Sequence, residues 1–152
     1  MTTALFVCVH NAGRSQMAAA ILNRLAGRLD IPISGASAGT EPSGRVHPNV
    51  VSVMDEWGID LSRSRPRLLT NDMAESARRV VTMGCEVDGA ACPALFLKDI
   101  EDWGLPDPAG KGLDEARELR DEIYRKVIDL VLGMPEAGDR RELLVKLVED
   151  CD

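Results

Sequence analysis

The stretch ALFVCVHNAGRS, residues 4–15, contains three kinds of local pattern in succession and thereby decides the fold. Residues Ala4 to Val9 form a nearly continuous apolar run rich in β-formers, as expected for a parallel strand buried on both faces. A short polar loop follows, and from Arg14 to about Leu29 the apolar residues recur at helical spacing. The stretch therefore predicts a strand, a tight loop and a helix, the opening unit of an α/β domain.

The rest of the chain continues this alternation. We expect strands at Ile33–Ala38, Arg79–Met83 and around Leu97–Trp103, and helices at Pro48–Trp57, Asn71–Ala77, Leu113–Leu132 and Asp139–Glu149. Right-handed crossovers would then give a flavodoxin-like three-layer α/β domain, in which helices cover both faces of a four-stranded parallel sheet. We assign residues 1–133 to a catalytic domain and residues 134–152 to a C-terminal extension with a short helix.

Composition limits the kinds of partner. The 152 residues include 18 Lys and Arg against 25 Asp and Glu, which gives a formal net charge of −7 at pH 7. This acidic balance disfavours a surface that binds nucleic acid or an anionic membrane. An anionic substrate must therefore be held by a few nearby positive or N–H groups. The sequence has no apolar window of the roughly 18 residues that a membrane span needs, and Met1–Leu5 lacks signal-peptide features. We expect a cytoplasmic monomer.

Four cysteines in a reducing compartment are more often catalytic, redox-active or metal-binding than structural. Cys8 lies near the end of the first predicted strand, and Arg14 begins the first helix six positions later. Backbone N–H groups of such a loop can converge on a tetrahedral oxyanion, whose oxygens the Arg14 fork can grip. The positive potential of these N–H groups and of Arg14 would also stabilise the thiolate of Cys8, which is the reactive form of a cysteine nucleophile. The expected oxyanion-binding residues are Val9, His10, Asn11, Ala12, Gly13 and Arg14.

Neighbouring residues fit this interpretation. Gly13 would let the backbone approach the anion, and the Ser15 hydroxyl can donate to the sulfur. We expect His10 to give the loop its shape or a hydrogen bond rather than to act as a general base. Taken alone, Cys8 would be a small buried hydrophobe and Arg14 a surface residue, but their placement between strand and helix favours a functional oxyanion loop.

A group leaving from phosphorus or arsenic needs a proton, and Asp107 is the candidate donor. It lies in the GLPDP segment after the fourth predicted strand, at the edge where parallel α/β sheets build their sites. From the residues alone, an ordinary Asp-Pro turn is the alternative.

Cys85 and Cys92 lie in a loop that begins where the third predicted strand ends. A zinc pair would need two further ligands, and the chain has only His10 and His47, so we expect no metal site. Two inert thiols are a second interpretation. The third is a reversible dithiol, because the small residues between the two cysteines would let the sulfurs meet if the loop rearranges.

The residue string resembles the low-molecular-weight tyrosine phosphatase superfamily, and within it most closely the arsenate reductases of the thioredoxin-coupled type. The resemblance covers about residues 4 to 132. The motifs that carry it are FVCVHNAGRSQMA at residues 6–18, SAGT at 37–40, MGC at 83–85, CP at 92–93, DPAGK at 107–111 and RDEI at 120–123. Asn11 and Ser37 match positions that support the loop in the family.

The resemblance implies a mechanism. Cys8 attacks arsenate, Asp107 protonates the departing water, and Cys85 attacks the Cys8 sulfur so that arsenite leaves and a Cys8–Cys85 disulfide forms. Cys92 then carries the disulfide outward to Cys85–Cys92. Reducing equivalents would come from thioredoxin, another redoxin or a low-molecular-weight thiol, and we expect no tightly bound cofactor.

Alternatives remain at this stage. A low-molecular-weight phosphatase hydrolysing phosphate monoesters would use the same loop, although Ala109 and Gly110 stand where such phosphatases usually carry aromatic residues. A non-enzymatic oxyanion-binding module is a third class, which the combination of Cys8, Arg14 and Asp107 disfavours.

Three positions depart from the family pattern. Gly13 replaces a second loop cysteine found in some reductases, and Ala19 replaces the glutamate of potassium-binding members, so we expect no bound monovalent cation. Cys151 lies in the tail beyond the usual end of the family, and we expect it to be a free thiol without a catalytic role.

Overall fold

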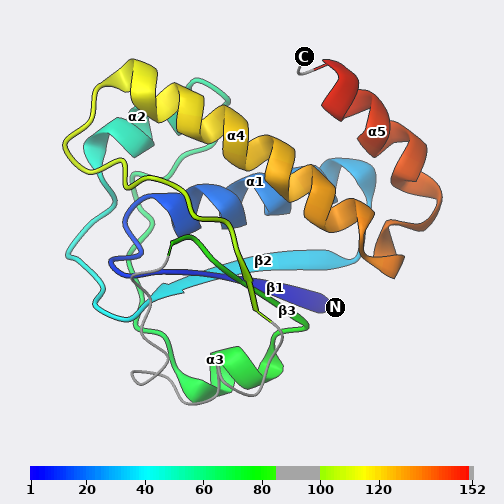
Figure 1. Ribbon diagram of the computed structural model, residues 1–152, viewed down its shortest axis with the longest axis horizontal. Helices are drawn as coiled ribbons and strands as arrows, with labels where there is room; N and C mark the ends of the chain where they lie inside the picture. Colours follow the sequence, from blue (N-terminus) through cyan, green and yellow to red (C-terminus); the bar gives the residue numbers. More distant parts are fainter. Residues whose placement is uncertain (85–99, 151–152) are drawn as a thin grey trace.

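The protein folds around a parallel β-sheet, seen in a computed structural model that describes residues 1–84 and 100–150 (Figure 1). The strand order in the sheet is β2-β1-β3-β4, and every pairing is parallel. The predicted four-stranded parallel sheet of a flavodoxin-like α/β domain is confirmed. The strands are β1 (Thr2–Cys8), β2 (Ile33–Gly39), β3 (Arg79–Thr82) and β4 (Ile100–Asp102).

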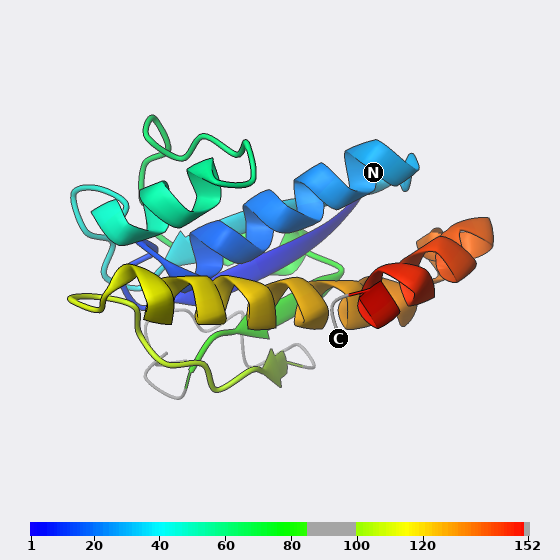
Figure 2. The ribbon, with the colours of Figure 1, turned by 90° about the horizontal axis from the view of Figure 1, so that it is seen from above.

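Helices cover the two faces of the sheet unequally (Figures 1 and 2). On one face lie α1 (Arg14–Leu29), α2 (Pro48–Asp55), α4 (Leu113–Leu132) and α5 (Arg141–Asp150), which follows a short 3-10 helix (Pro135–Arg140). On the other face lies α3 (Asn71–Ser76). No helix in residues 1–84 or 100–150 is both long and apolar enough to cross a membrane.

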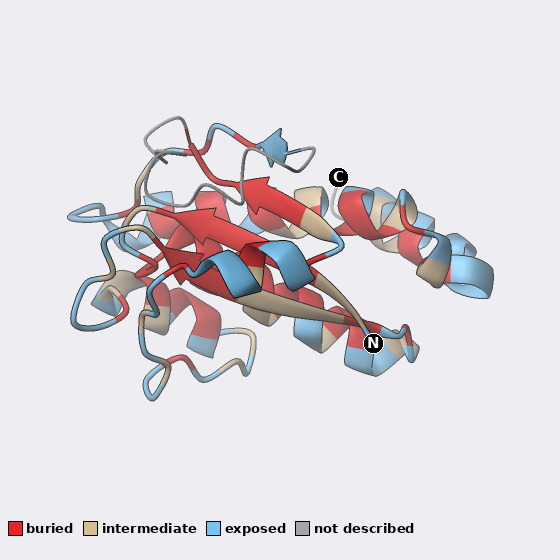
Figure 3. Ribbon diagram, turned by 90° about the horizontal axis from the view of Figure 1, so that it is seen from below, coloured by how far each residue is buried: buried red, intermediate tan, exposed pale blue. Residues whose placement is uncertain are grey.

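The central strand β1 is buried on both faces, as its apolar run predicts. Ala4, Phe6 and Cys8 belong to the larger core cluster, together with α1, α2 and α4. Leu5 and Val7 belong to a smaller cluster on the side of α3. Figure 3 shows β1 and β3 buried over much of their length, whereas the edge strand β4 and the outer sides of the helices are exposed. Burial on both faces fixes the end of β1, where Cys8 stands.

Element boundaries differ from the sequence prediction in a few places. β1 runs from Thr2 to Cys8 and leaves Val9 in the loop. α2 ends at Asp55 rather than Trp57, because the chain tightens there and the Trp57 N–H donates three residues back, to Met54. β4 covers Ile100–Asp102, and residues 97–99 of the predicted strand lie outside the described residues.

The C-terminal region also differs from the prediction of one helix from Asp139. Gly138 has φ 46° and ψ −124°, which interrupts helical geometry, so α5 begins only at Arg141. Leu144 of α5 is fully buried in the larger core cluster, and α5 thereby packs on the same core as the strands.

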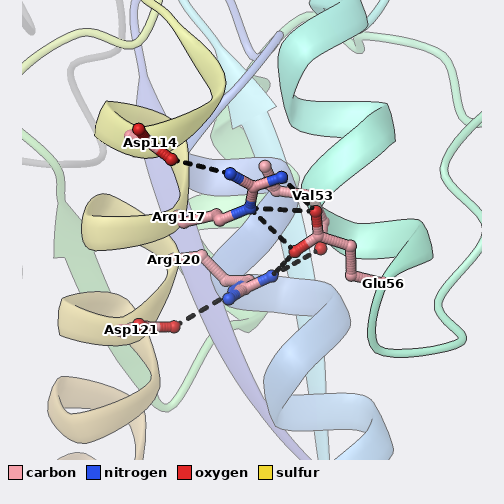
Figure 4. A network of polar contacts seen from close by, with 6 residues as sticks. All are labelled: Val53, Glu56, Asp114, Arg117, Arg120 and Asp121. Carbon is pink, nitrogen blue, oxygen red and sulfur yellow. Dashed lines mark hydrogen bonds and ion pairs between the residues drawn. The ribbon is translucent and has the colours of Figure 1, made fainter.

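A polar network fastens α2 to α4 (Figure 4). The Arg120 side chain, 8% exposed, donates to the Val53 carbonyl and to Glu56 Oε1, both at 2.8 Å. Arg120 also lies over the Trp57 ring, 4.2 Å from its centroid. The Arg117 guanidinium donates to both Glu56 carboxylate oxygens. Hydrogen bonds from Arg117 and Arg120 hold the pKa of Glu56 at about 2, against an ordinary value of 4.5.

The lowered pKa of Glu56 predicts an acid-dependent loss of stability. The ionised carboxylate stabilises the folded protein above about pH 4.5, and this contribution is lost as the pH falls from 4.5 towards 2. We expect Glu56→Gln to lower the melting temperature by about 2–4 °C at pH 7 and by less at pH 3. Thermal unfolding of both proteins at the two pH values measures this. Glu118→Gln, on the exposed side of α4, is the control; equal losses at both pH values would contradict the prediction.

Candidate active site

The loop from Val9 to Gly13 turns its carbonyl groups outward. The backbone N–H groups of Glu41, Ser43 and His47 donate to the carbonyls of Val9, His10 and Ala12 at 2.8, 3.0 and 2.8 Å respectively. The Asn11 carbonyl accepts from the Gln16 side chain, and the Gly13 carbonyl accepts from Met17. Every peptide bond in the described residues of this loop and its neighbours is trans. Because each trans peptide points its N–H opposite to its C=O, the N–H groups of residues 10–14 face the inside of the loop.

The Cys8 sulfur lies at the base of this loop. Cys8 is 3% exposed, and its Sγ is 2.9 Å from Ser15 Oγ and accepts from the Asn11 N–H at 3.2 Å. The Asn11 side chain donates to Ser15 Oγ at 2.7 Å, which leaves the Ser15 hydroxyl hydrogen for the sulfur. Two donors therefore point at one buried sulfur. The expected contact between Ser15 and Cys8 is present.

Asn11 holds the loop to its surroundings. Its Oδ1 accepts from the Arg67 backbone N–H at 2.9 Å and from the Gln16 side chain at 3.2 Å. The backbone donor fixes which side of the amide is oxygen, so the amide nitrogen faces Ser15. Asn11 itself has φ 49°, in the left-handed region that asparagine tolerates better than most residues. The supporting role expected of Asn11 is therefore visible in its contacts.

Ser37 and His10 have more limited roles. Ser37 lies on β2 opposite Phe6, and its carbonyl accepts from the Arg67 guanidinium. His10 is exposed, and its Nδ1 is 3.0 Å from the Glu41 carbonyl oxygen, to which it can donate. This is the loop hydrogen bond expected of His10.

Arg14 connects the loop to the segment that carries Asp107. It is 4% exposed, and its Nη1 donates to the Leu105 carbonyl at 2.9 Å. The Leu105 N–H in turn donates to the Met83 carbonyl at 2.7 Å, so this segment is anchored next to the end of β3. A Cβ on Gly13 would lie 2.6 Å from Pro108 Cγ, which shows that Pro108 packs directly on the loop. Asp107 therefore lies beside the entrance to the loop.

Asp107 is half-buried, and its Oδ1 accepts from the Ala109 N–H at 3.0 Å. The carboxylate thus closes a short turn, the local structure that Asp-Pro favours from sequence alone. A turn hydrogen bond uses one carboxylate oxygen and leaves the other available for a proton.

Sequence reasoning missed two residues, Asn49, which holds the Asp107 segment, and His47, which packs on the oxyanion loop. The Asn49 side chain donates to the carbonyls of Pro108 and Lys111 at 2.8 and 3.1 Å, which joins the start of α2 to this segment. His47 lies within 3.3 Å of the Cβ position of Gly13. Burial lowers the pKa of His47, and the nearby Asp107 carboxylate opposes this shift. The only sequence signal was their place around Pro48, between the second strand and the second helix.

The structure brings Cys8, Arg14, Ser15 and Asp107 together with the loop residues Val9 to Gly13. Cys85, Cys92 and Cys151 lie outside the described residues. Their predicted roles remain predictions, as does the division of the chain at residue 133.

Comparison with known proteins agrees with this geometry. Residues 3–140 match the family described as low molecular weight phosphotyrosine protein phosphatase, and the chain belongs to that family. A protein of Halobacterium salinarum named "Putative arsenate reductase" is 43% identical over 130 residues, which cover 82% of this chain and 87% of the relative.

Two solved structures are also similar. The first, described as an arsenate reductase in the phosphate binding state, has a TM-score of 0.73 and 33% identity and covers 86% of this chain and 96% of its own. The second is the thioredoxin-dependent arsenate reductase Cg_ArsC1' of Corynebacterium glutamicum, with a TM-score of 0.68 and 37% identity. The match covers 86% of this chain and 60% of the Corynebacterium glutamicum chain.

The close approach of β2 to the loop gives a test of the loop's rigidity. A Cβ on Gly39 would lie 2.5 Å from the Val9 carbonyl oxygen and 2.9 Å from the Asn11 nitrogen, both backbone atoms. We expect Gly39→Ala to lower the free energy of unfolding by about 1–3 kcal/mol and to weaken phosphate binding. Urea unfolding and calorimetric titration with phosphate measure the two effects. Gly44→Ala, where a Cβ meets nothing within 4 Å, should change neither; equal behaviour of the two variants would refute the steric argument.

Proposed function

We propose that this protein is an arsenate reductase, which converts arsenate to arsenite with electrons from thiols. The observation that carries the proposal is the buried Cys8 sulfur with two hydrogen-bond donors, at the base of a loop whose peptide N–H groups face inward. A tetrahedral oxyanion is the ligand that such a loop fits. The names of the similar proteins described above support arsenate as that oxyanion.

The first step joins sulfur to arsenic. The Cys8 thiolate attacks the arsenic of protonated arsenate, one As–OH bond breaks, and Asp107 supplies a proton to the departing hydroxyl so that it leaves as water. The inward N–H groups of residues 10–14 and the Arg14 guanidinium neutralise the remaining arsenic oxygens. Arsenic stays in oxidation state V in this adduct, so the step moves no electrons.

The reduction follows in the second step. The Cys85 thiolate attacks the Cys8 sulfur, the sulfur–arsenic bond breaks, and its electron pair stays on arsenic, which leaves as arsenite. Cys8 and Cys85 are then joined by a disulfide and have together lost two electrons. Cys92 attacks Cys85 in turn, which frees Cys8 and forms the Cys85–Cys92 disulfide.

In this relay a dithiol protein then reduces the Cys85–Cys92 disulfide. Thioredoxin is the donor that we propose first, because the similar reductase of Corynebacterium glutamicum is described as thioredoxin-dependent. Another redoxin, or a low-molecular-weight thiol that attacks the Cys8 adduct directly, is the alternative. Any of these donors requires a reducing compartment, and we infer that the protein works in the cytoplasm.

The relay is tested by arsenate-dependent NADPH oxidation with thioredoxin and thioredoxin reductase. We expect turnover by the wild type and by Cys151→Ser, and none by Cys8→Ser, Cys85→Ser or Cys92→Ser. Full turnover by both Cys85→Ser and Cys92→Ser would rule out the relay. If the wild type reduces no arsenate but rapidly hydrolyses an aryl phosphate, the protein is a phosphatase instead.

The role of Asp107 is tested by a variant that keeps its shape. Asp107→Asn preserves an oxygen that can accept from the Ala109 N–H, but it has no proton to give to the leaving oxygen. We expect kcat for arsenate to fall about a hundred- to ten-thousand-fold, while arsenate affinity changes little. Steady-state kinetics and calorimetric titration separate the two effects. A variant with near wild-type kcat would exclude Asp107 as the acid.

A further inference from the structure

A cavity of about 640 Å³ lies on the helical side of the sheet, away from the Cys8 loop. Its walls come from the C-terminal half of α1, from α4, from the turn after α2 and from Leu147 of α5. Figure 2 shows α1 and α4 side by side, with α5 against the far end of α4. The lining residues of α1 extend from Ile21 to Leu29, about 10–20 Å along the helix from Arg14.

One wall of this cavity comes from the last helix. α5 spans Arg141–Asp150 and contributes Leu147, beyond the family match, which ends at residue 140. None of the lining residues belongs to the Cys8 loop or to the Asp107 segment. The cavity is therefore separate from the oxyanion site.

The aromatic part of the lining is held in place before any ligand arrives. The Trp57 ring meets the Tyr124 ring edge to face, with centroids 5.5 Å apart, and the Arg120 guanidinium lies over Trp57. Arg24 donates to the carbonyls of Trp57 and Gly58 at 3.2 and 2.7 Å, which fixes the turn after α2. A preformed aromatic surface binds a flat apolar group at little cost in conformational entropy.

The charge of the lining is opposite to that of the whole protein. Three arginines, Arg24, Arg28 and Arg125, line the cavity together with a single carboxylate, Asp121. The local balance is therefore positive, although the chain carries a formal net charge of −7. The positive lining therefore favours an anionic ligand at this cavity, whereas the net negative charge of the protein disfavours one elsewhere.

We propose that this cavity binds a small amphipathic organic anion, in which an aromatic or aliphatic body carries one carboxylate or sulfonate. The apolar body would lie between Trp57, Tyr124 and Leu147, and the anionic group would lie beside the arginines. The volume is within the usual range for small-molecule sites. The site is independent of arsenate reduction, so its failure would leave the proposed function untouched.

Two fluorescent probes separate charge from apolar contact. Anilinonaphthalene sulfonate is an amphipathic anion, and N-phenylnaphthylamine has nearly the same aromatic body without the charge. We expect the sulfonate to bind in a one-to-one ratio. In proton–nitrogen NMR spectra it should shift the indole N–H signal of Trp57 and leave that of Trp103 in place.

Matched variants then assign the contacts. Arg28→Gln should weaken sulfonate binding about fivefold, the effect of one partly exposed ion pair, and leave the neutral probe unchanged. Arg78→Gln, on an exposed residue between α3 and β3, is its control. Leu147→Glu should weaken binding of both probes, whereas Val145→Glu on the exposed side of α5 should weaken neither.

The proposal is overturned if the sulfonate does not bind, if it shifts Trp103 and not Trp57, or if Arg28→Gln and Arg78→Gln behave alike. Equal weakening of the neutral probe by Arg28→Gln would also overturn it, because the arginine would then contribute no charge recognition. Circular dichroism checks that Leu147→Glu retains α5. If α5 is lost in that variant, the comparison of Arg28→Gln with Arg78→Gln tests the proposal by itself.

Discussion

The Asn11 side-chain amide is the constraint on which the functional loop depends. Its oxygen accepts hydrogen bonds from the Arg67 backbone and the Gln16 side chain. Its nitrogen donates to the hydroxyl of Ser15, which lies against the Cys8 sulfur. These contacts hold Asn11 in its left-handed conformation and aim its N–H at the sulfur. The amide therefore couples the Arg67 segment and the start of α1 to the orientation of one nucleophile.

The main architecture was predictable because it follows from local patterns. The apolar run of residues 4–9 corresponds to a strand, which ends one residue earlier at Cys8, and the helical spacing after Arg14 is a helix with the expected bounds. The α4 helix also begins and ends where the sequence predicts, at Leu113 and Leu132. In each case the hydrophobic pattern of the sequence agrees with the burial of the element, so tertiary contacts have little to change.

The features that the sequence did not predict depend mainly on contacts between residues far apart in the chain. Asn49 holds the carbonyl of Pro108, 59 positions away, and no local pattern indicates such a pair. His47 resembles any polar residue before a helix until packing places it against Gly13. The division of the last segment into a 3-10 helix and α5 depends on Gly138, whose backbone conformation composition alone does not specify.

Burial of Cys8 also acts as a size filter. At 3% exposure, the residue is accessible to a group as small as an oxyanion that enters the loop, but a cysteine on the surface of another folded protein is far too bulky to reach it. The same enclosure protects the sulfur from bulky disulfides and from adventitious cross-linking between molecules. For the reaction proposed above, such enclosure favours a relay through thiols of the same chain over direct attack by a protein donor.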